Sequence, residues 1–188
     1  MSEHKRMRLA VIGATGSVGG SVLDICARFP DRFDVVSLAA CSNSAKLTEL
    51  GRTFNCRKLG LTEPAGKFTE PGFECLTGVE ALSVLAADEE VDQVVFASSG
   101  TSAIRALQTA LKMDKNVSLA NKESIVVAGP WVMPLVKRQD QLRPVDSEHS
   151  AIWQCLRDAP HKEVAKIWLT ASGGPFRSYT AAQMGSVT

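Results

Sequence analysis

A strand-like run that ends in a glycine-rich turn and continues as a helix constrains the fold of this 188-residue chain more than any other feature. The run Arg8–Ile12 leads into the turn Gly13–Gly19, and apolar side chains then recur at helical spacing as far as Phe29. This order of strand, turn and helix is typical of folds that bind a dinucleotide. An ordinary glycine-rich turn is the alternative, but the strand before it and the helix after it favour cofactor binding.

The glycines of this turn have separate physical roles. Gly13 permits the sharp exit from the strand, Gly16 lets the backbone approach a pyrophosphate, and Gly19 allows the helix to pack closely on the sheet. Thr15 and Ser17 add hydroxyl donors, and the free amides at the helix N-terminus favour an anion. We therefore expect a dinucleotide phosphate at this turn.

The end of the second predicted strand indicates which dinucleotide binds. A carboxylate about 20 residues after the glycine turn is typical of NAD sites, where it binds the ribose hydroxyl. Here the strand Phe33–Ala40 ends in Cys41–Lys46, a segment without an acid. Because a carboxylate would repel a 2′-phosphate and these side chains would not, the sequence favours NADP. Ser42 and Asn43 can also cap the next helix, and capping and phosphate binding are compatible at one helix start.

Strands alternate with helices along most of the chain, which predicts an α/β fold with a doubly wound, parallel, Rossmann-like sheet. Apolar runs predict further strands over residues 57–61, 91–97, 116–120, 142–145 and 166–170. Helices are predicted over 45–54, 78–87, 102–113, 131–137 and 150–156, and a loop over 62–74. Because ligands in such sheets bind where the strands end, Thr15, Ser42, Ser98 and Asn121 are expected along one crevice.

A change in composition near residues 130–144 divides the chain into two predicted domains. Residues 1–140 are expected to bind the dinucleotide, and residues 141–188 are expected to begin a second, catalytic α/β domain. No closing element is evident before Thr188, so we expect the chain to be truncated.

Charge and cysteine content exclude several classes of protein. Lys and Arg number 21 and Asp and Glu 20, and the net charge of +1 gives no electrostatic case for nucleic acid or a membrane surface as a partner. The five cysteines are scattered and form no C-x-x-C pair, which argues against a disulfide framework or a zinc ribbon and favours a reducing cytoplasm. The sequence shows no targeting segment and no apolar run of the roughly 20 residues that span a bilayer.

Two carboxylates after a predicted strand form a candidate metal site. Asp146 and Glu148 are alternate residues, so an extended backbone would place both on one side, where they suit Mg²⁺ or Mn²⁺ beside a phosphorylated substrate. In the alternative, Asp146 or Ser147 caps the next helix and Glu148 lies in its electropositive first turn.

Two further polar segments follow predicted strands. In Asn121-Lys122-Glu123 the lysine can hold an oxyanion and the amide can fix a cofactor, or Asn121 can cap a helix beside a solvated lysine. In Ser172–Pro175 a hydroxyl beside flexible backbone suits a phosphate, and a simple loop turn is the alternative.

Together these segments resemble the 1-deoxy-D-xylulose 5-phosphate reductoisomerase family, which uses NADPH in the non-mevalonate isoprenoid pathway. The matching stretches occur in family order and span nearly the whole chain: Gly13–Gly19, Leu119–Ser124, Pro144–Ile152 and Ser172–Phe176. The two middle stretches are specific to the family, whereas the glycine turn is not.

The resemblance implies roles for individual residues. Cofactor contacts fall to Thr15, Gly16, Ser17, Val18, Cys41, Ser42, Asn43, Asn121 and Glu123. Metal binding falls to Asp146 and Glu148, substrate contacts to Lys122, Ser147, Glu148 and Ser172, and catalysis to Lys122 and Glu148. Family members often carry a glycine and a basic residue where this chain has Cys41 and Ser42, which leaves Lys46 as a substitute for the basic residue.

The resemblance also implies a reaction. A divalent metal, Mg²⁺ or Mn²⁺, chelates the oxygens of the phosphorylated sugar and promotes a retro-aldol rearrangement, and NADPH reduces the resulting aldehyde to 2-C-methyl-D-erythritol 4-phosphate. Lys122 would stabilise the developing oxyanion. The full-length protein is expected to be a homodimer. The lid, the third metal carboxylate and the C-terminal helical domain of the family do not follow Thr188, so we expect this chain to bind NADPH with little or no turnover.

Two other functions stay open. A different NADP oxidoreductase, such as a semialdehyde dehydrogenase, would use Cys155 as nucleophile, but its helical spacing with Ile152 and Leu156 favours a buried structural cysteine. A stand-alone nucleotide-binding module would bind the cofactor with no role for Asp146 or Glu148.

Overall fold

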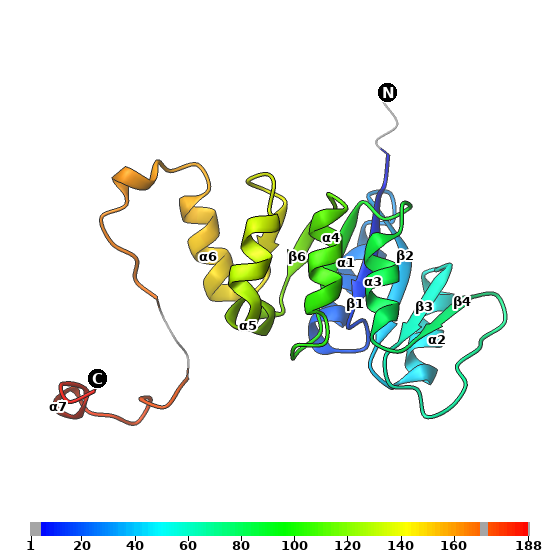
Figure 1. Ribbon diagram of the computed structural model, residues 1–188, viewed down its shortest axis with the longest axis horizontal. Helices are drawn as coiled ribbons and strands as arrows, with labels where there is room; N and C mark the ends of the chain where they lie inside the picture. Colours follow the sequence, from blue (N-terminus) through cyan, green and yellow to red (C-terminus); the bar gives the residue numbers. More distant parts are fainter. Residues whose placement is uncertain (1–4, 170–172, 188) are drawn as a thin grey trace. The chain divides into compact units, whose positions relative to one another are not determined.

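The computed structural model describes residues 5–169 and 173–187, and the chain divides into two compact units, Met1–Asp146 and Ser147–Thr188. The larger unit contains a seven-stranded sheet in which every neighbouring pair of strands is parallel (Figure 1). Helices connect most successive strands. The predicted α/β, Rossmann-like fold class is thereby confirmed.

The sheet has the strand order β4-β3-β2-β1-β5-β6-β7. Its strands are β1 Met7–Ile12, β2 Phe33–Ala40, β3 Lys58–Leu61, β4 Glu74–Thr77, β5 Gln93–Phe96, β6 Asn116–Leu119 and β7 Leu142–Pro144. The helices of this unit are α1 Ser17–Arg28, α2 Ser44–Thr53, α3 Glu80–Ala87, α4 Ile104–Lys112 and α5 Lys122–Val132, followed by the short 3₁₀ helix η1, Met133–Leu135.

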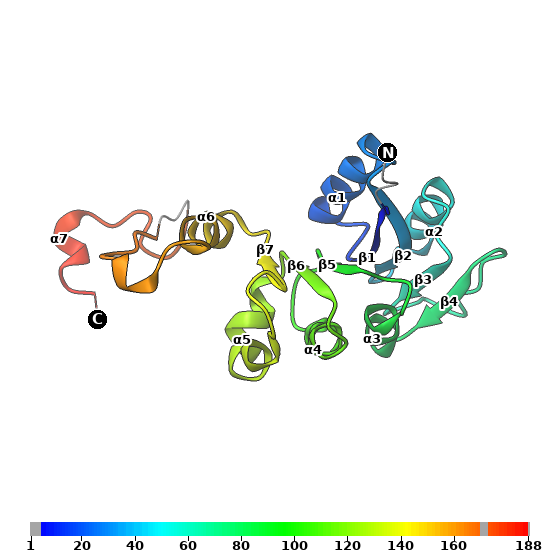
Figure 2. The same ribbon diagram turned by 90° about the horizontal axis from the view of Figure 1, so that it is seen from above.

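Helices cover the sheet from two sides, as Figure 2 shows, with α1 and α2 on one face and α3, α4 and α5 on the other. The alternation of side chains along β1 explains this arrangement. Leu9 and Val11 pack in one apolar cluster with α1 and α2, whereas Ala10 and Ile12 pack in a second cluster with α3, α4 and α5. The central strand is therefore buried on both faces.

The strand order reverses beside β1. The chain moves outward from β1 through β2, β3 and β4, and then returns to place β5 on the other side of β1. Loops that leave β1 and β5 on opposite sides open a crevice at the carboxyl ends of these strands, where ligands bind in sheets of this kind.

Two elements of this unit differ from the prediction. The predicted loop over 62–74 is confirmed up to its last residue, where the edge strand β4 begins; β4 itself was not predicted, because its side chains are at most partly buried and its apolar signal is correspondingly weak. The helix predicted over 131–137 instead begins at Lys122 and ends at Val132. Its β-branched residues, its internal glycine and Pro130 are poor helix formers, so local propensity concealed it.

The second unit contains α6 Ser147–Leu156, the 3₁₀ helix η2 His161–Glu163 and α7 Ala181–Met184. None of its residues whose burial is described is buried. The strand predicted over 166–170 is absent from its described part, 166–169, where Trp168 is 77% exposed, because no strand of the described unit pairs with it. Cys155 is exposed, so the expectation of a buried cysteine is also wrong. Across the described chain, no helix has the length and apolar character needed to cross a membrane.

Candidate functional site

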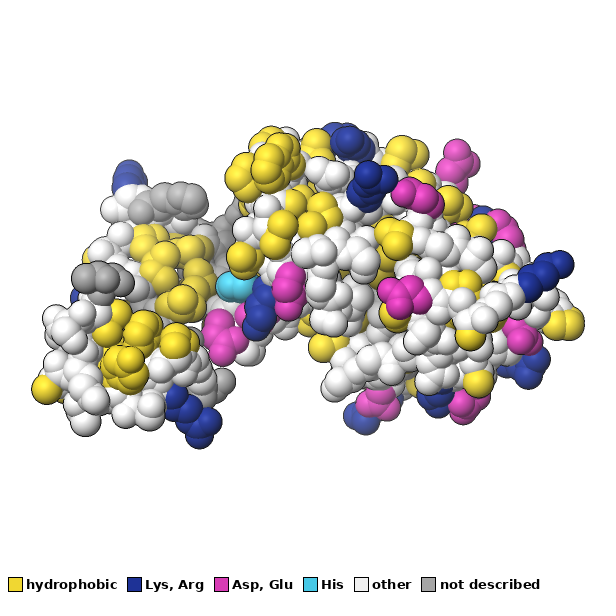
Figure 3. Space-filling view, turned by 60° about the horizontal axis from the view of Figure 1, so that its bottom comes forward, with side chains coloured by type: hydrophobic (Ala, Val, Ile, Leu, Met, Phe, Trp, Pro, Cys, Tyr) yellow, Lys and Arg dark blue, Asp and Glu magenta, His cyan; other side chains and the backbone are white. Residues whose placement is uncertain are grey.

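A cavity of about 510 Å³ lies at the carboxyl ends of the strands in the larger unit. The segments that follow β1, β2, β3, β5, β6 and β7 all contribute to its wall, together with the start of α3. Figure 3, in which this edge comes forward, shows acidic and basic side chains interspersed over the larger unit. The cavity follows the crevice that the reversal of strand order predicts.

The turn between β1 and α1 has the conformation that its glycines predict. Gly13 has a φ of +91°, and a Cβ there would lie 2.5 Å from the backbone nitrogen of Ser98. A Cβ on Gly19 would lie 2.3 Å from the carbonyl oxygen of Gly13, so only glycine lets α1 pack this closely. A Cβ on Gly16, in contrast, would meet nothing nearer than that same oxygen, at 3.4 Å. Packing within the protein does not require glycine at position 16, whereas a ligand lying against the backbone would.

The N-terminus of α1 presents hydrogen-bond donors at the cavity. Gly16 is its N-cap residue, no side chain caps the helix, and the first turn contains no acid. Thr15, Gly16, Ser17 and Val18 all line the cavity. Uncapped amides and the helix dipole together attract an anion. The four residues predicted at the cofactor phosphates are therefore brought together around one anion-binding helix start.

The residues predicted after β2 divide between lining the cavity and capping a helix. Cys41 lines the cavity, whereas Ser42 and Asn43 are exposed and do not line it. The Oδ1 atom of Asn43 accepts a hydrogen bond from the backbone nitrogen of Lys46 at 3.0 Å, which confirms the predicted helix cap. The Nζ atom of Lys46 lies 2.9 Å from Oε2 of Glu49 on the next turn.

Asn121 is fully buried and hydrogen-bonded inside the protein. Its Oδ1 atom accepts hydrogen bonds from the backbone nitrogen and the hydroxyl of Ser124, at 2.9 and 2.8 Å. Its Nδ2 atom donates to the carbonyl oxygen of Gly100 at 2.9 Å, which connects the start of α5 to the loop after β5. Asn121 thus caps α5 behind the cavity wall, and its neighbours Lys122 and Glu123 line the cavity.

Lys122 and Asp146 form an ion pair at the end of the cavity beside β6 and β7. Their Nζ and Oδ2 atoms lie 3.3 Å apart, with the lysine side chain 57% exposed and the aspartate side chain 15% exposed. Both residues line the cavity. A carboxylate that already pairs with a cation on the cavity wall fits the chemistry of a divalent metal ligand, and the ammonium group can stabilise an oxyanion.

The remaining predicted residues, Ser147, Glu148 and Ser172, belong to the second unit. Ser147 and Glu148 occupy the first turn of α6 in the second unit, so the expectation that an extended backbone aligns the two carboxylates is wrong, and the helical alternative for Glu148 is confirmed. Ser172 lies outside the described residues. The part of the chain that the structure describes contains no group of three or more His, Cys, Asp or Glu side chains able to hold a metal ion.

Several cavity residues were not predicted. They are Thr62 and Glu63 after β3, Val79 and Leu82 at the start of α3, and Ser99 and Ser102 after β5. The predicted strand over 57–61 would have pointed to Thr62 and Glu63, because ligands gather where strands end. Val79 and Leu82 give no comparable signal, since only the packing of α3 on the sheet brings them to the cavity.

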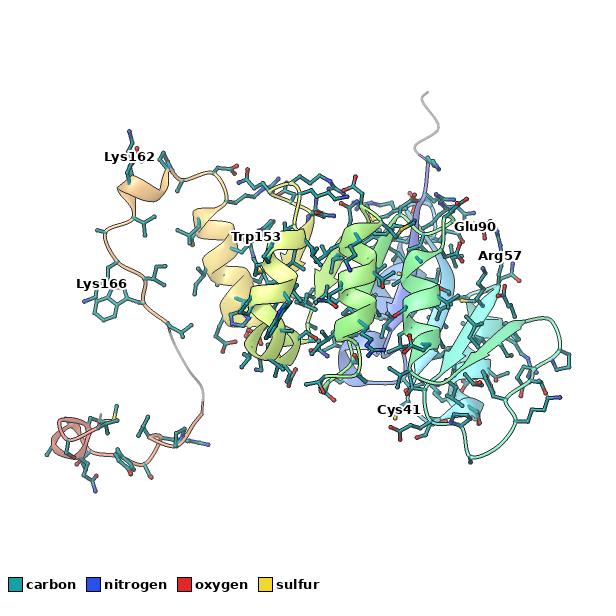
Figure 4. All side chains as sticks on the ribbon, viewed as in Figure 1. Cys41, Arg57, Glu90, Trp153, Lys162 and Lys166 are labelled. Carbon is teal, nitrogen blue, oxygen red and sulfur yellow. The ribbon has the colours of Figure 1, made fainter. Side chains whose placement is uncertain are left out.

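The amino-terminal ends of the strands, opposite the cavity, carry structural ion pairs. Arg8 of β1 donates hydrogen bonds to Asp92 just before β5, with Nε–Oδ2 and Nη2–Oδ1 distances of 3.0 and 2.7 Å. The Arg8 guanidinium lowers the pKa of Asp92 to about 2, mainly through these hydrogen bonds. Figure 4 shows Arg57 and Glu90, which also pair, near this edge, and Cys41 near the carboxyl edge. The pair formed by Arg8 and Asp92 joins the two segments that flank the crevice.

Family models match both parts of the chain. The model described as 1-deoxy-D-xylulose 5-phosphate reductoisomerase matches residues 9–129, and the model of the C-terminal domain of that enzyme matches residues 142–188. Curated relatives with the same name include proteins of Thermomicrobium roseum, 41% identical over 186 residues, and Desulfitobacterium hafniense, 40% identical over 188 residues. These matches cover 97% and 96% of this chain but only 48% and 49% of the relatives. The chain therefore spans about half the length of the curated relatives it matches.

Solved structures of proteins that carry this enzyme name have the same fold as this chain. The structure from Zymomonas mobilis in complex with NADPH superimposes with a TM-score of 0.79 at 36% identity and covers 98% of this chain and 50% of its own. A structure with fosmidomycin and magnesium has a TM-score of 0.80 at 33% identity and covers 97% of this chain and 50% of its own.

Proposed function

The chain belongs to the 1-deoxy-D-xylulose 5-phosphate reductoisomerase family, and we propose that it supplies the NADPH-binding half of such an enzyme and the beginning of its catalytic region. The observation that carries this proposal is the cavity at the carboxyl edge, which extends from the segment after β3 past the glycine turn to Lys122 and Asp146. We assign cofactor binding to residues 1–140 and the catalytic region to residues 141–188, and the two matched family segments, 9–129 and 142–188, support that division.

The order of the strands orients the cofactor in this proposal. The amides of Ser17 and Val18 and the hydroxyl of Thr15 would hold the pyrophosphate at the end of β1. Cys41 after β2 would contact the adenosine half, and Glu123 after β6 would contact the nicotinamide half. Lys122 and Asp146 line the same cavity, where the cofactor would supply a hydride to a substrate.

Selectivity for NADP rests on the segment after β2. Cys41, Ser42 and Asn43 place no carboxylate there, so a 2′-phosphate meets no repulsion from them. The amides at the start of α2 can bind a phosphate although Asn43 already caps the helix, because one cap leaves other amides free. Lys46 pairs with Glu49, and it must leave that exposed pair to contact the phosphate.

Asn121 is a positioning residue in this proposal. All of its described hydrogen bonds are internal, and they fix the start of α5. The two residues that follow, Lys122 and Glu123, thereby reach the cavity from a rigid helix N-terminus. Such rigidity helps a catalytic lysine because its position is set before substrate binds.

The proposed reaction converts 1-deoxy-D-xylulose 5-phosphate to 2-C-methyl-D-erythritol 4-phosphate. The cofactor supplies a hydride and the divalent cation supplies Lewis acidity. Asp146 and Glu148 would hold the cation, Mg²⁺ or Mn²⁺, and Lys122, Ser147 and Ser172 would contact the phosphorylated sugar. The Lys122 ammonium stabilises negative charge on the substrate oxygen during the rearrangement.

Two further properties of the complete protein are proposed with this function. Its location is the cytoplasm, and the five cysteines, all free in the structure, fit a reducing compartment. Its assembly is a homodimer, as the family resemblance implies.

Calorimetric titration of the chain with the phosphorylated substrate tests this proposal. NADPH is added first, and substrate is then titrated with and without Mn²⁺. We expect substrate to bind to the NADPH-loaded chain only with Mn²⁺. In Asp146→Asn, substrate should no longer bind even with Mn²⁺, while the affinity for NADPH stays within about two-fold of the wild-type value. Asp140→Asn, which changes an aspartate that does not line the cavity, is the matched control. Manganese-dependent substrate binding that survives in Asp146→Asn would contradict the assignment of this carboxylate.

A further inference from the structure

Glu63 places an uncompensated carboxylate at one end of the cavity. It directly follows Thr62 at the end of β3, and its side chain is exposed. Within residues 5–169 and 173–187, its carboxylate has neither a hydrogen bond nor an ion pair. Its backbone nitrogen, in contrast, donates to the carbonyl oxygen of Cys41 at 2.8 Å, which fixes the segment beside the end of β2. The acid is therefore held at the cavity by its backbone and is free to meet a ligand.

The strand order places Glu63 beyond the region where the ribose phosphate is expected. The glycine turn follows β1, Cys41 follows β2 and Glu63 follows β3, and these three strands are neighbours in the sheet. Strands lie about 4.8 Å apart, so the end of β3 is about 10 Å from the anion-binding turn. A dinucleotide whose pyrophosphate lies at the turn would place its ribose near β2 and its base near β3.

The cavity that Glu63 lines also contains apolar side chains that suit a flat base. Val79, the residue before α3, lines the cavity with its side chain 43% exposed, and Leu82 of α3 lines it as well. Apolar side chains of this kind cover the face of an aromatic ring. Because an ionised carboxylate only accepts hydrogen bonds, its natural partner on a purine is an amino group. Adenine has one such group, the 6-amino group, on the edge away from the sugar.

We propose that Glu63 selects adenine by accepting a hydrogen bond from the 6-amino group of the cofactor, while Val79 packs on the face of the base. This inference rests on the proposed function, because it requires the cavity to bind NADPH. It adds a specificity residue after β3 to a cofactor site whose other assigned residues follow β1, β2 and β6. In the competing arrangement, Glu63 faces the 2′-phosphate and weakens NADPH binding.

Titration with two cofactors that differ only in the base tests the proposal. The probes are NADPH and its purine analogue, in which a hydrogen replaces the 6-amino group so that this edge of the base has no donor. The wild-type chain should bind NADPH at least about ten-fold more tightly, because the analogue loses a hydrogen bond to a charged group. In Glu63→Ala the ratio of the two affinities should fall to within about two-fold. Glu63→Gln should keep only part of the discrimination, because its amide oxygen can still accept from the amino group but carries no charge.

Control variants and a third cofactor separate the alternatives. Glu89→Ala removes another exposed acid, one that does not line the cavity, and should keep the wild-type ratio. A ratio that stays at the wild-type value in Glu63→Ala overturns the inference while leaving the proposed function intact. A gain in NADPH affinity relative to NADH in Glu63→Ala also overturns it, because the acid then faces the 2′-phosphate. If the folded wild-type chain binds neither NADPH nor its analogue, the proposed function itself fails, and this inference fails with it.

Discussion

Replacement of Gly16 by alanine should separate cofactor binding from folding. Gly16 has a φ of −84° and a ψ of 175°, a conformation that alanine adopts without strain. The added Cβ would lie 3.4 Å from the carbonyl oxygen of Gly13, which is an ordinary contact. Alanine restricts the unfolded chain, which stabilises the protein by about 0.4–1 kcal/mol, but it is a poorer N-cap residue than glycine. We therefore expect the free energy of unfolding of Gly16→Ala to stay within about 1 kcal/mol of the wild-type value.

The same variant should bind NADPH much more weakly. The Cβ occupies space at the cavity wall where a pyrophosphate would approach the amides of α1. Loss of one hydrogen bond to a charged group costs about 1.5–3 kcal/mol, which corresponds to a roughly 10- to 100-fold higher Kd. Two neighbouring glycines provide contrasts. Gly19→Ala should destabilise the fold by about 3 kcal/mol because its Cβ overlaps backbone atoms. Gly20→Ala, which meets nothing within 4 Å, should stabilise α1 by about 1 kcal/mol and leave binding unchanged.

Urea denaturation and NADPH titration of the three variants separate the effect on folding from the effect on cofactor binding. Stability is measured without cofactor, and affinity is measured under conditions in which each variant is fully folded. Wild-type affinity in Gly16→Ala would refute the reasoning, because it would mean that no ligand lies against the backbone at this position. A loss of stability in Gly16→Ala as large as that in Gly19→Ala would refute it in another way, since the glycine would then serve packing alone.

Two other outcomes are expected. Cys41 is exposed and lines the cavity, so NADPH at ten times its Kd should slow alkylation of Cys41 about ten-fold. The alkylation rate of the exposed Cys155 should not change, as mass spectrometry of the labelled peptides would show. Equal alkylation rates of Cys41 with and without cofactor would count against the site. The pKa of Asp92 is lowered from 3.8 to about 2, so its contribution to stability is complete above pH 4 and is lost as the pH falls from about 4 to 2. Arg8→Gln should therefore cost about 1 kcal/mol at pH 7, a value reduced by solvent screening, and should flatten the stability curve in that acid range, whereas an unchanged curve would contradict the role of the pair.

Local rules explain which parts of the fold could be predicted from the sequence. The turn Gly13–Gly19 was predictable because its backbone conformation and close packing exclude other residues at two positions. The strands β1, β2 and β5 were predictable because they are largely buried and mainly apolar. The strand β6 was predictable because its buried residues, Val117 and Leu119, alternate with partly buried polar ones. The edge strand β4 and the helix α5 escaped prediction because their residues have weak or contrary local propensities, and tertiary packing decides their structure.

The candidate site shows a similar division. Thr15, Gly16, Ser17 and Val18 were predicted from a local motif and lie together at the cavity. The internal hydrogen bonds of Asn121 to Ser124 and Gly100 depend on how the loop after β5 meets α5, so the sequence left its two roles open. The contribution of Val79 and Leu82 depends on the docking of α3 against the sheet, for which no local pattern exists.

The strand predicted over 166–170 illustrates a limit of apolar patterns. The run Lys166–Leu169 has the composition of a strand, yet a strand requires a hydrogen-bonding neighbour. The described part of the second unit supplies none, so the segment remains outside regular structure with Ile167 and Trp168 exposed. Composition alone therefore overestimates sheet structure in this region.

The most direct test of the central claim is a calorimetric titration of the folded chain with NADPH and, separately, with NADH. The account predicts one NADPH per chain, bound more tightly than NADH because no carboxylate follows β2, and binding that is roughly 10- to 100-fold weaker in Gly16→Ala. Absence of binding of either cofactor to the folded chain, or tighter binding of NADH than of NADPH, would contradict the account.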